Sequence, residues 1–261
     1  MIFLVEFLVC LAASTVGGIC GIGGGVVIKP VLDAMGVMPV ATLSFLSGLT
    51  VLLMAVVNVW KNRRSNALDK RRSIPLAIGA ALGGLIGKQM FQTLKNALDS
   101  DRMVGLVQAV VLGLLVLGTL IYVQQKARVH SRSIQHRGLG AAVGTALGML
   151  SAFLGIGGGP MNLAVLYYFF SMDTKQAAVN SILIILISQT ASLFMTLATA
   201  SVPAFDWRSL VAMSVAGIWG GFLSARLHRK LSARQTDALF KMLLVVILLI
   251  CAWNAGKNGW G

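Results

Sequence analysis

The sequence predicts an all-α polytopic membrane protein made of two inverted repeats, each a broken re-entrant helical hairpin plus three transmembrane helices. Three observations lead to this prediction. The 261 residues are 57% hydrophobic and 11% charged, whereas a soluble domain has about 25% charged residues. A stretch with four glycines in five residues occurs once in each half. Clusters of Lys and Arg separate the long apolar runs, as in the cytoplasmic loops of membrane proteins.

The glycine-rich stretches 21–25 (Gly-Ile-Gly-Gly-Gly) and 155–159 (the same five residues) interrupt apolar runs. Glycine costs about 1 kcal/mol relative to alanine inside a helix, so each stretch should break one. Pro160 suits the first position of a new helix, where its missing N–H is not needed. The runs 2–35 and 138–171 are therefore predicted to be helix–break–helix elements.

Length indicates that both elements are re-entrant hairpins. As one helix, each run would be about 51 Å long, which exceeds a hydrocarbon core of about 30 Å. The arm after the second break, with about 12 residues, reaches about 18 Å and cannot complete a crossing. A hairpin that enters the membrane, turns at the glycines and returns is consistent with both lengths.

The basic segments 61–72, 125–137 and 226–234 hold 14 of the 22 Lys and Arg residues and are all predicted to be cytoplasmic. The last two share a side only if the run 138–171 returns to the side where it began. Each half then makes three crossings, so the second half is inverted relative to the first. Secondary transporters often have this plan, with discontinuous helices meeting near the midplane.

The chain order gives matching elements in two predicted repeats, 1–125 and 136–261. Gly83-Gly84 and Gly220-Gly221 are 137 residues apart, as are Asp69 and Asp206, which indicates an internal duplication. The predicted spans are 39–60, 74–91 and 103–124 in the first repeat, and 177–200, 208–225 and 236–253 in the second.

The two breaks predict an anion site. Unpaired N–H groups at the start of a half-helix carry partial positive charge, and glycines let a ligand approach them closely. The alternative is a structural turn packed tightly against a neighbour, but two symmetric copies favour binding. The predicted substrate-binding residues are Gly21, Gly23, Gly24, Gly25, Lys29, Ser44, Gly155, Gly157, Gly158, Gly159, Asn162, Asn180 and Ser181.

The polar residues in this set have two interpretations. Their side chains can donate hydrogen bonds to an oxyanion, or they can hold neighbouring helices together. Lys29 can attract a dianion or extend to the membrane interface. Lys88 and Arg226 end apolar spans and are predicted to be interface anchors. The glycines at 140, 144 and 148 predict close helix packing.

Other functional classes find no support in the sequence. The three cysteines show no CxxC spacing and are predicted to be buried thiols. The histidines have no carboxylate partner at ligand spacing, so no metal, cofactor or catalytic site is expected, and no enzyme activity. The net charge of +14 lies in short loops rather than on a soluble domain, so nucleic acid is not an expected partner.

Several motifs together resemble a known family. They are the paired glycine stretches, Pro30, the Ala-x-x-Ser openings at 41–44 and 178–181, and Asp206-Trp207-Arg208. They resemble the sulfite exporter TauE/SafE family, also called the toluene sulfonate uptake permease family, over nearly the whole chain. The resemblance implies a bacterial or archaeal inner-membrane permease for sulfite, sulfonates or related sulfur anions. The chain departs from the pattern at Ala164, where the second proline would stand, and at Lys29.

The resulting hypothesis is a secondary transporter, in the family often an exporter, that moves small sulfur-containing oxyanions such as sulfite or organosulfonates by alternating access around the two breaks. An anion channel is an alternative, because two facing hairpins can frame a filter; a permease for another small anion is a second. Glu6 and Asp33 are the intramembrane carboxylates that proton coupling could use. The predicted partners are the anion and the lipid bilayer; a homodimer remains open.

Overall fold

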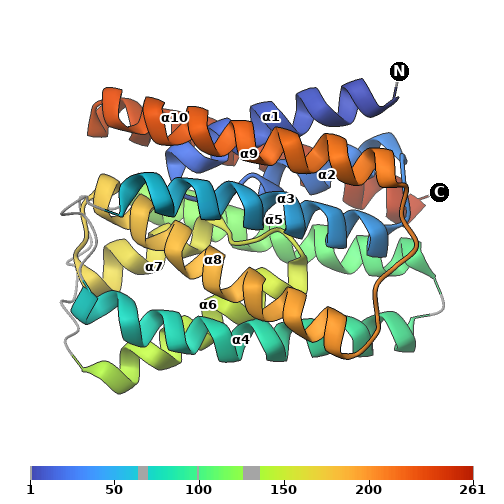
Figure 1. Ribbon diagram of the computed structural model, residues 1–261, viewed down its shortest axis with the longest axis horizontal. Coiled ribbons are helices and arrows are strands. Elements are labelled where there is room, and N and C mark those ends of the chain that lie inside the picture. Colours follow the sequence, from blue (N-terminus) through green and yellow to red (C-terminus); the bar gives the residue numbers. More distant parts are fainter. Residues whose placement is uncertain (1, 64–69, 99, 126–135, 261) are drawn as a thin grey trace.

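The computed structural model describes residues 2–63, 70–98, 100–125 and 136–260. Within these ranges the chain is helical apart from turns and short loops (Figure 1). The described helices are α1 (Ile2–Cys20), α2 (Gly25–Met35), α3 (Val40–Asn62), α4 (Lys70–Ala97), α5 (Asp101–Gln125), α6 (Arg137–Leu154), α7 (Pro160–Phe170), α8 (Thr174–Ala198), α9 (Trp207–Lys230) and α10 (Ala233–Trp260).

Seven of these helices are long and apolar enough to cross a membrane: α1, α3, α4, α5, α8, α9 and α10. Large apolar side chains such as Leu114, Phe194 and Trp219 are exposed on them. Exposed apolar surface on this scale suits contact with lipid rather than water. The predicted all-α class is confirmed, and the protein is a multi-pass membrane protein.

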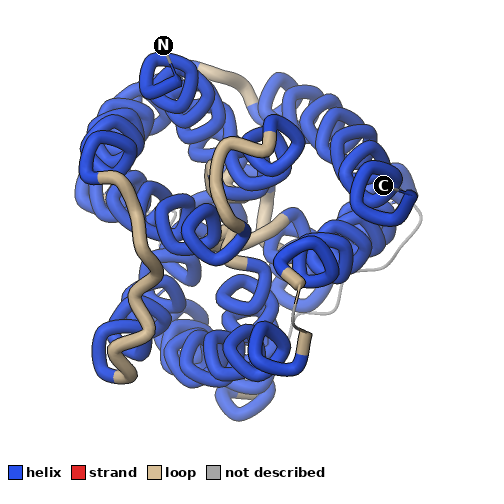
Figure 2. Tube along the Cα trace, turned by 90° about the vertical axis from the view of Figure 1, so that its right-hand side faces the viewer, coloured by secondary structure: helices blue, strands red, loops and turns tan. Residues whose placement is uncertain are grey.

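The helices run roughly along one common axis, so most of them are seen end-on in Figure 2. Each half packs mainly on the other. Three contacts of the first half have a counterpart with the halves exchanged. α1 packs on α9 and α6 on α4; α3 packs on α9 and α8 on α4; α2 packs on α10 and α7 on α5. This exchange of partners supports the predicted inverted repeat, which stays a prediction.

The helix pair α5 and α10, which the repeat makes equivalent to each other, packs antiparallel. The guanidinium of Arg102, at the start of α5, donates to the carbonyl of Lys257 near the end of α10 at 3.4 Å. Further along, a Cβ built on Gly113 would lie 3.6 Å from Cβ of Cys251. Two equivalent helices that run in opposite directions are what an inversion requires.

The broken elements appear where they were predicted, with arms of unequal length. α2 and α7 have 11 residues each, about 16 Å, so neither can cross the hydrocarbon core. α1 has 19 residues, about 28 Å, so this arm alone is nearly as long as the hydrocarbon core is thick. The chain turns back immediately, because the N–H groups of Ile22 and Gly23 both bond the carbonyl of Gly17.

Glycines allow α4 and α6 to pack backbone to backbone. A Cβ on Gly83 would collide with the carbonyl of Thr145, and a Cβ on Gly144 with the carbonyl of Leu76. The predicted close packing is therefore confirmed at Gly144 and Gly148, whereas a Cβ on Gly140 would lie 3.4 Å from Pro75, an ordinary contact. Without a hydrophobic driving force between helices in lipid, such close approach is a main source of helix association.

The basic segment 226–234 was predicted to be a loop, and this is wrong. α9 continues to Lys230 and α10 begins at Ala233, so Arg226 and Arg229 lie on a helix. Basic side chains are favoured near a helix C-terminus because that end carries partial negative charge. Hydropathy locates only the apolar part of a helix, which is why α4 and α9 also extend beyond the predicted spans 74–91 and 208–225.

The other two basic segments are described only in part. Residues 64–69 and 126–135 lie outside the described residues. The cytoplasmic location of all three segments therefore stays a prediction.

We expect Gly144→Leu to destabilise the protein by about 2 kcal/mol or more, because the new side chain meets the backbone of α4 and cannot move aside. Gly118→Leu is the matched control, since nothing lies within 4 Å of a Cβ built there. Thermal unfolding in detergent should separate the two variants. Equal midpoints would show that the α4–α6 contact is not as close as described.

Candidate functional site

Both breaks turn through left-handed backbone conformations that glycine adopts without strain. Side chains are disfavoured at positive φ because Cβ clashes with the backbone. The positive φ angles are 77° at Gly21, 79° at Gly23, 62° at Gly155, 70° at Gly157 and 126° at Gly158. The turn itself therefore explains these five glycines.

Close packing explains two more. Gly24 has an ordinary helical backbone, but a Cβ on it would lie 2.8 Å from Cα of Ser14. A Cβ on Gly25 would collide with the backbone carbonyl of Ile156. The start of α2 is thus covered by the second break. Gly159 is different, because a Cβ there would meet Ile156 only at 3.9 Å, an ordinary contact.

The two breaks touch each other in the middle of the molecule. A Cβ on Gly23 would lie 3.1 Å from the carbonyl oxygen of Gly157, and one on Gly158 would lie 3.4 Å from the carbonyl oxygen of Ile22. The structure therefore brings together the glycines that the sequence placed 134 residues apart. In this conformation the space between the breaks is filled by their own backbones.

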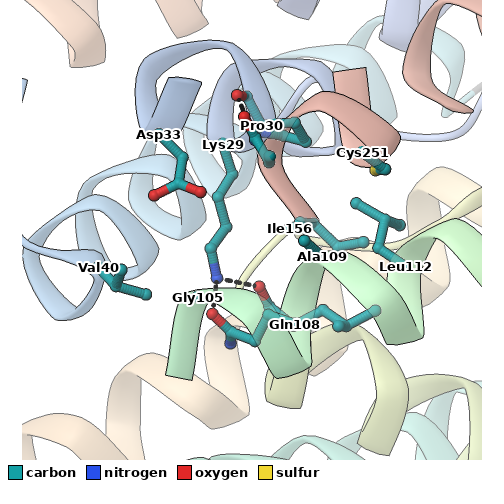
Figure 3. Close-up of a pocket in the computed structure, with 12 residues that line it drawn as sticks. Lys29, Pro30, Asp33, Val40, Gly105, Gln108, Ala109, Leu112, Ile156 and Cys251 are labelled. Atoms are coloured by element: carbon teal, nitrogen blue, oxygen red, sulfur yellow. Dashed lines mark hydrogen bonds between the residues drawn. The ribbon is translucent and has the colours of Figure 1, made fainter. Parts of the chain in front are cut away.

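Lys29 bridges the two halves (Figure 3). Its Nζ donates to the carbonyl of Leu154 at 2.6 Å and to Oε1 of Gln108 at 2.5 Å. Nε2 of Gln108 in turn donates to the carbonyl of Phe153 at 2.8 Å. These carbonyls end α6, where the glycine break removes their helical partners. A cation is also favoured by the negative end of the helix dipole. Lys29 is 6% exposed, so its interpretation as an interface residue is wrong.

Two further side chains satisfy carbonyls at the breaks. Oγ of Ser47 on α3 donates to the carbonyl of Gly155 at 2.8 Å. Nδ1 of His228 on α9 bonds the carbonyl of Ile19, near the end of α1, at 2.8 Å, and must be the donor because a carbonyl only accepts. Each break is thus capped by side chains from the opposite half of the chain.

Sequence reasoning missed Gln108, Ser47 and His228. Gln108 and Ser47 are polar residues inside apolar spans, which is the signal that could have identified them. His228 carried no such signal, because it stands among basic residues of a segment that was taken for a loop.

Three of the predicted donors have no hydrogen-bond partner among the residues that the structure describes. They are the hydroxyls of Ser44 and Ser181 and the Nδ2 amide of Asn162, all buried. Buried polar groups are nearly always satisfied, so these atoms call for a ligand or a water molecule. Asn180 is engaged differently: its Oδ1 accepts from Oγ of Ser73, and its Nδ2 donates to a carbonyl one turn earlier at 2.7 Å.

The unpartnered serines lie on the two helices that flank the breaks. Ser44 on α3 contacts the second break, since a Cβ on Gly155 would lie 2.8 Å from Cβ of Ser44. α8 contacts the first break, where a Cβ on Gly21 would collide with Ala178, one turn before Ser181. Each serine therefore stands on the span that passes the break of the opposite half.

The two carboxylates considered for coupling occupy different surroundings. Glu6 is buried and lines an open pocket of about 490 Å³ together with Asp206 and Ser209, and its Oε2 has no hydrogen-bond partner within the described ranges. Asp33 lines a cavity of about 20 Å³ beside Lys29. The three cysteines are free and buried, as predicted.

Comparison with known proteins is consistent with these features. A family model described as "Sulfite exporter TauE/SafE" matches residues 6–254. "Probable membrane transporter protein YunE" of Bacillus subtilis (strain 168) is 23% identical over 279 aligned residues, which cover 96% of each chain. "Probable membrane transporter protein" of Xylella fastidiosa (strain 9a5c) is 26% identical over 247 residues, covering 91% of this chain and 90% of that one.

No solved structure matches the chain. The family match begins within α1 and ends within α10, so it includes both breaks and every helix between them. It confirms the resemblance drawn from the glycine stretches and their flanking motifs. The chain belongs to the sulfite exporter TauE/SafE family of membrane transporters.

Proposed function

We propose that this protein exports small sulfur-containing oxyanions, such as sulfite, by alternating access around the two glycine breaks. The observation that carries the proposal is the pair of unpartnered hydroxyls of Ser44 and Ser181, each on the span beside the break of the opposite half. The family description, which names sulfite, supplies the chemical class.

The chemistry of the buried donors suits an oxyanion. An anion that leaves water needs hydrogen-bond donors in place of its hydration shell, and bonds to charged groups are stronger than neutral ones. Leaving a donor buried and unpaired costs about 1–3 kcal/mol. Ser44, Ser181 and Asn162 each present such a donor among the described residues, and a hydrogen bond to an oxyanion would remove the cost.

The caps across the halves suggest how the breaks move. The side chains of Lys29, Ser47 and His228 each bond a backbone carbonyl at the break of the opposite half. A displacement of one half relative to the other would strain or exchange these bonds together, so the two breaks would move as a coupled unit. Alternating access, in which a site near Ser44 and Ser181 opens to one side of the membrane at a time, requires such coupling.

The proposal includes the inverted repeats 1–125 and 136–261 and a defined orientation. The basic segments 61–72, 125–137 and 226–234 would face the cytoplasm of a bacterial or archaeal cell. The exchanged helix pairs and the antiparallel packing of α5 and α10 support the inversion.

The orientation predicts which single cysteines react with a membrane-impermeant maleimide. In intact bacterial cells, Ser100→Cys should be labelled, and Ser232→Cys should be labelled only after permeabilisation. Both positions are exposed, and the native cysteines are buried, so the background should be low. The reverse pattern would overturn the orientation, and labelling of both in intact cells would overturn the number of crossings.

If the protein transports sulfite, Ser44→Ala should impair transport without destabilising the fold. We expect the KM for labelled sulfite in proteoliposome counterflow to rise about tenfold, because a hydrogen bond to the anion is lost. The unfolding temperature should stay the same or rise, since that hydroxyl has no hydrogen-bond partner among the described residues. Ser181→Ala should behave alike.

Thr119→Val is the control for both serines, because it removes a buried hydroxyl that already bonds a carbonyl of its own helix. Its KM should equal that of the wild type. Flux that rises linearly with sulfite concentration, without counterflow, would favour a channel. Absence of flux for every sulfur oxyanion tested would overturn the proposed substrate class.

A further inference from the structure

A small cavity adjoins the second break among α3, α4, α6 and α8. Its volume is about 30 Å³, room for about two water molecules. Its polar lining comes from side chains of three helices and one backbone glycine: Ser44, Lys88, Gly155, Gln189, Ser192 and Thr196. Among the described residues, the lining contains no Asp or Glu.

Lys88 is the unexpected member of this lining. The sequence interpretation made it an interface anchor at the end of a span, and that is wrong. α4 continues for more than two turns beyond it, to Ala97, and Lys88 is 8% exposed. Its ammonium lies 5.3 Å from the ring centroid of Phe91. In the part of the chain that the structure describes, no carboxylate pairs with it.

A buried ammonium without a counter-charge is unfavourable in a membrane protein. Its desolvation costs several kcal/mol, and intramembrane cations normally pair with a carboxylate or mark a substrate path. The cavity also holds the unpartnered hydroxyl of Ser44, an independent sign that something is bound here. Gln189 is partly committed, because its Nε2 donates to Oγ of Ser151 at 3.3 Å.

We propose that this cavity is a charged subsite of the transport path, in which Lys88 and Ser44 bind a compact inorganic oxyanion of the size of sulfite. The inference rests on the proposed function and narrows its substrate class. The small volume selects against the organic tail of an organosulfonate.

The subsite exists in only one half. The repeat that places Ser181 opposite Ser44 places Ala225 opposite Lys88, at the same separation of 137 residues. The hydroxyl is therefore duplicated and the cation is not. Since the cavity lies between the second break and the ends of α4 and α8, the proposed orientation puts it on the non-cytoplasmic side. An exported anion would occupy it last, before release.

The test measures binding separately from transport. With the full-length protein in detergent, sulfite should raise the unfolding temperature of the wild type in a concentration-dependent way. Lys88→Gln should weaken the apparent affinity at least about tenfold, and Lys88→Arg should restore part of it. The ligand-free Lys88→Gln protein should be as stable as the wild type or more so, because a buried unpaired charge has gone.

Lys95→Gln is the matched control, since Lys95 is an exposed lysine on the same helix. It should bind sulfite like the wild type. Taurine should neither stabilise the protein nor compete with sulfite, and equal competition by taurine would overturn the compact-anion inference. Unchanged sulfite affinity in Lys88→Gln would overturn the role of Lys88, while proteoliposome flux would still test the transport function.

Failure of the proposed sulfur substrate can also be distinguished from failure of the anion subsite. If phosphate or nitrate, but no sulfur oxyanion, stabilises the wild type in a manner that depends on Lys88, the anion subsite stands and the proposed sulfur substrate fails. If Lys88→Gln lowers the unfolding temperature without ligand, and no anion shifts that of the wild type, Lys88 is structural and the inference fails.

Discussion

Carbonyl groups freed by a broken helix inside a membrane have no water to bond, and this constraint shapes the centre of the molecule. α6 ends at Leu154, and its last carbonyls accept from Lys29 and Gln108 of the first half. α1 ends near Ile19, whose carbonyl accepts from His228 of the second half. Each break bonds some of its carbonyls within its own half and the others through side chains of the opposite half, so the packing of the two halves on each other stabilises both hairpins.

In this geometry most of the glycines have a structural role, and the side chains beside them are the better candidates for binding. Positive φ explains the glycines that turn the chain, and close backbone approach explains Gly24 and Gly25. Of the two helix starts that were expected to bind an anion, that of α2 is covered by Ile156. Of the predicted donors, Ser44, Ser181 and Asn162 have no partner among the described residues, and the proposed binding function rests on them.

The predicted duplication is symmetric in its framework and asymmetric in its charges. The exchanged helix pairs and the two flanking serines are present in both halves. Lys29 and Lys88 occur only in the first half, where Leu163 and Ala225 are their counterparts in the second. A symmetric frame can place a ligand equally near both membrane faces. A charge on one side only makes the energy of a bound anion differ between the inward-open and the outward-open state. Directional transport would use such an inequality.

The sequence by itself determined the helical membrane class, the position of both breaks and the close packing at Gly144, because hydropathy and glycine chemistry act over a few neighbouring residues. Only the tertiary structure decided that Lys29 and Lys88 are buried, and among which helices. A lysine near the end of an apolar run has the same local pattern whether it extends to the interface or is buried. The difference depends on which distant helix supplies its surroundings, here α5 and α6 for Lys29, and α3 and α8 for Lys88.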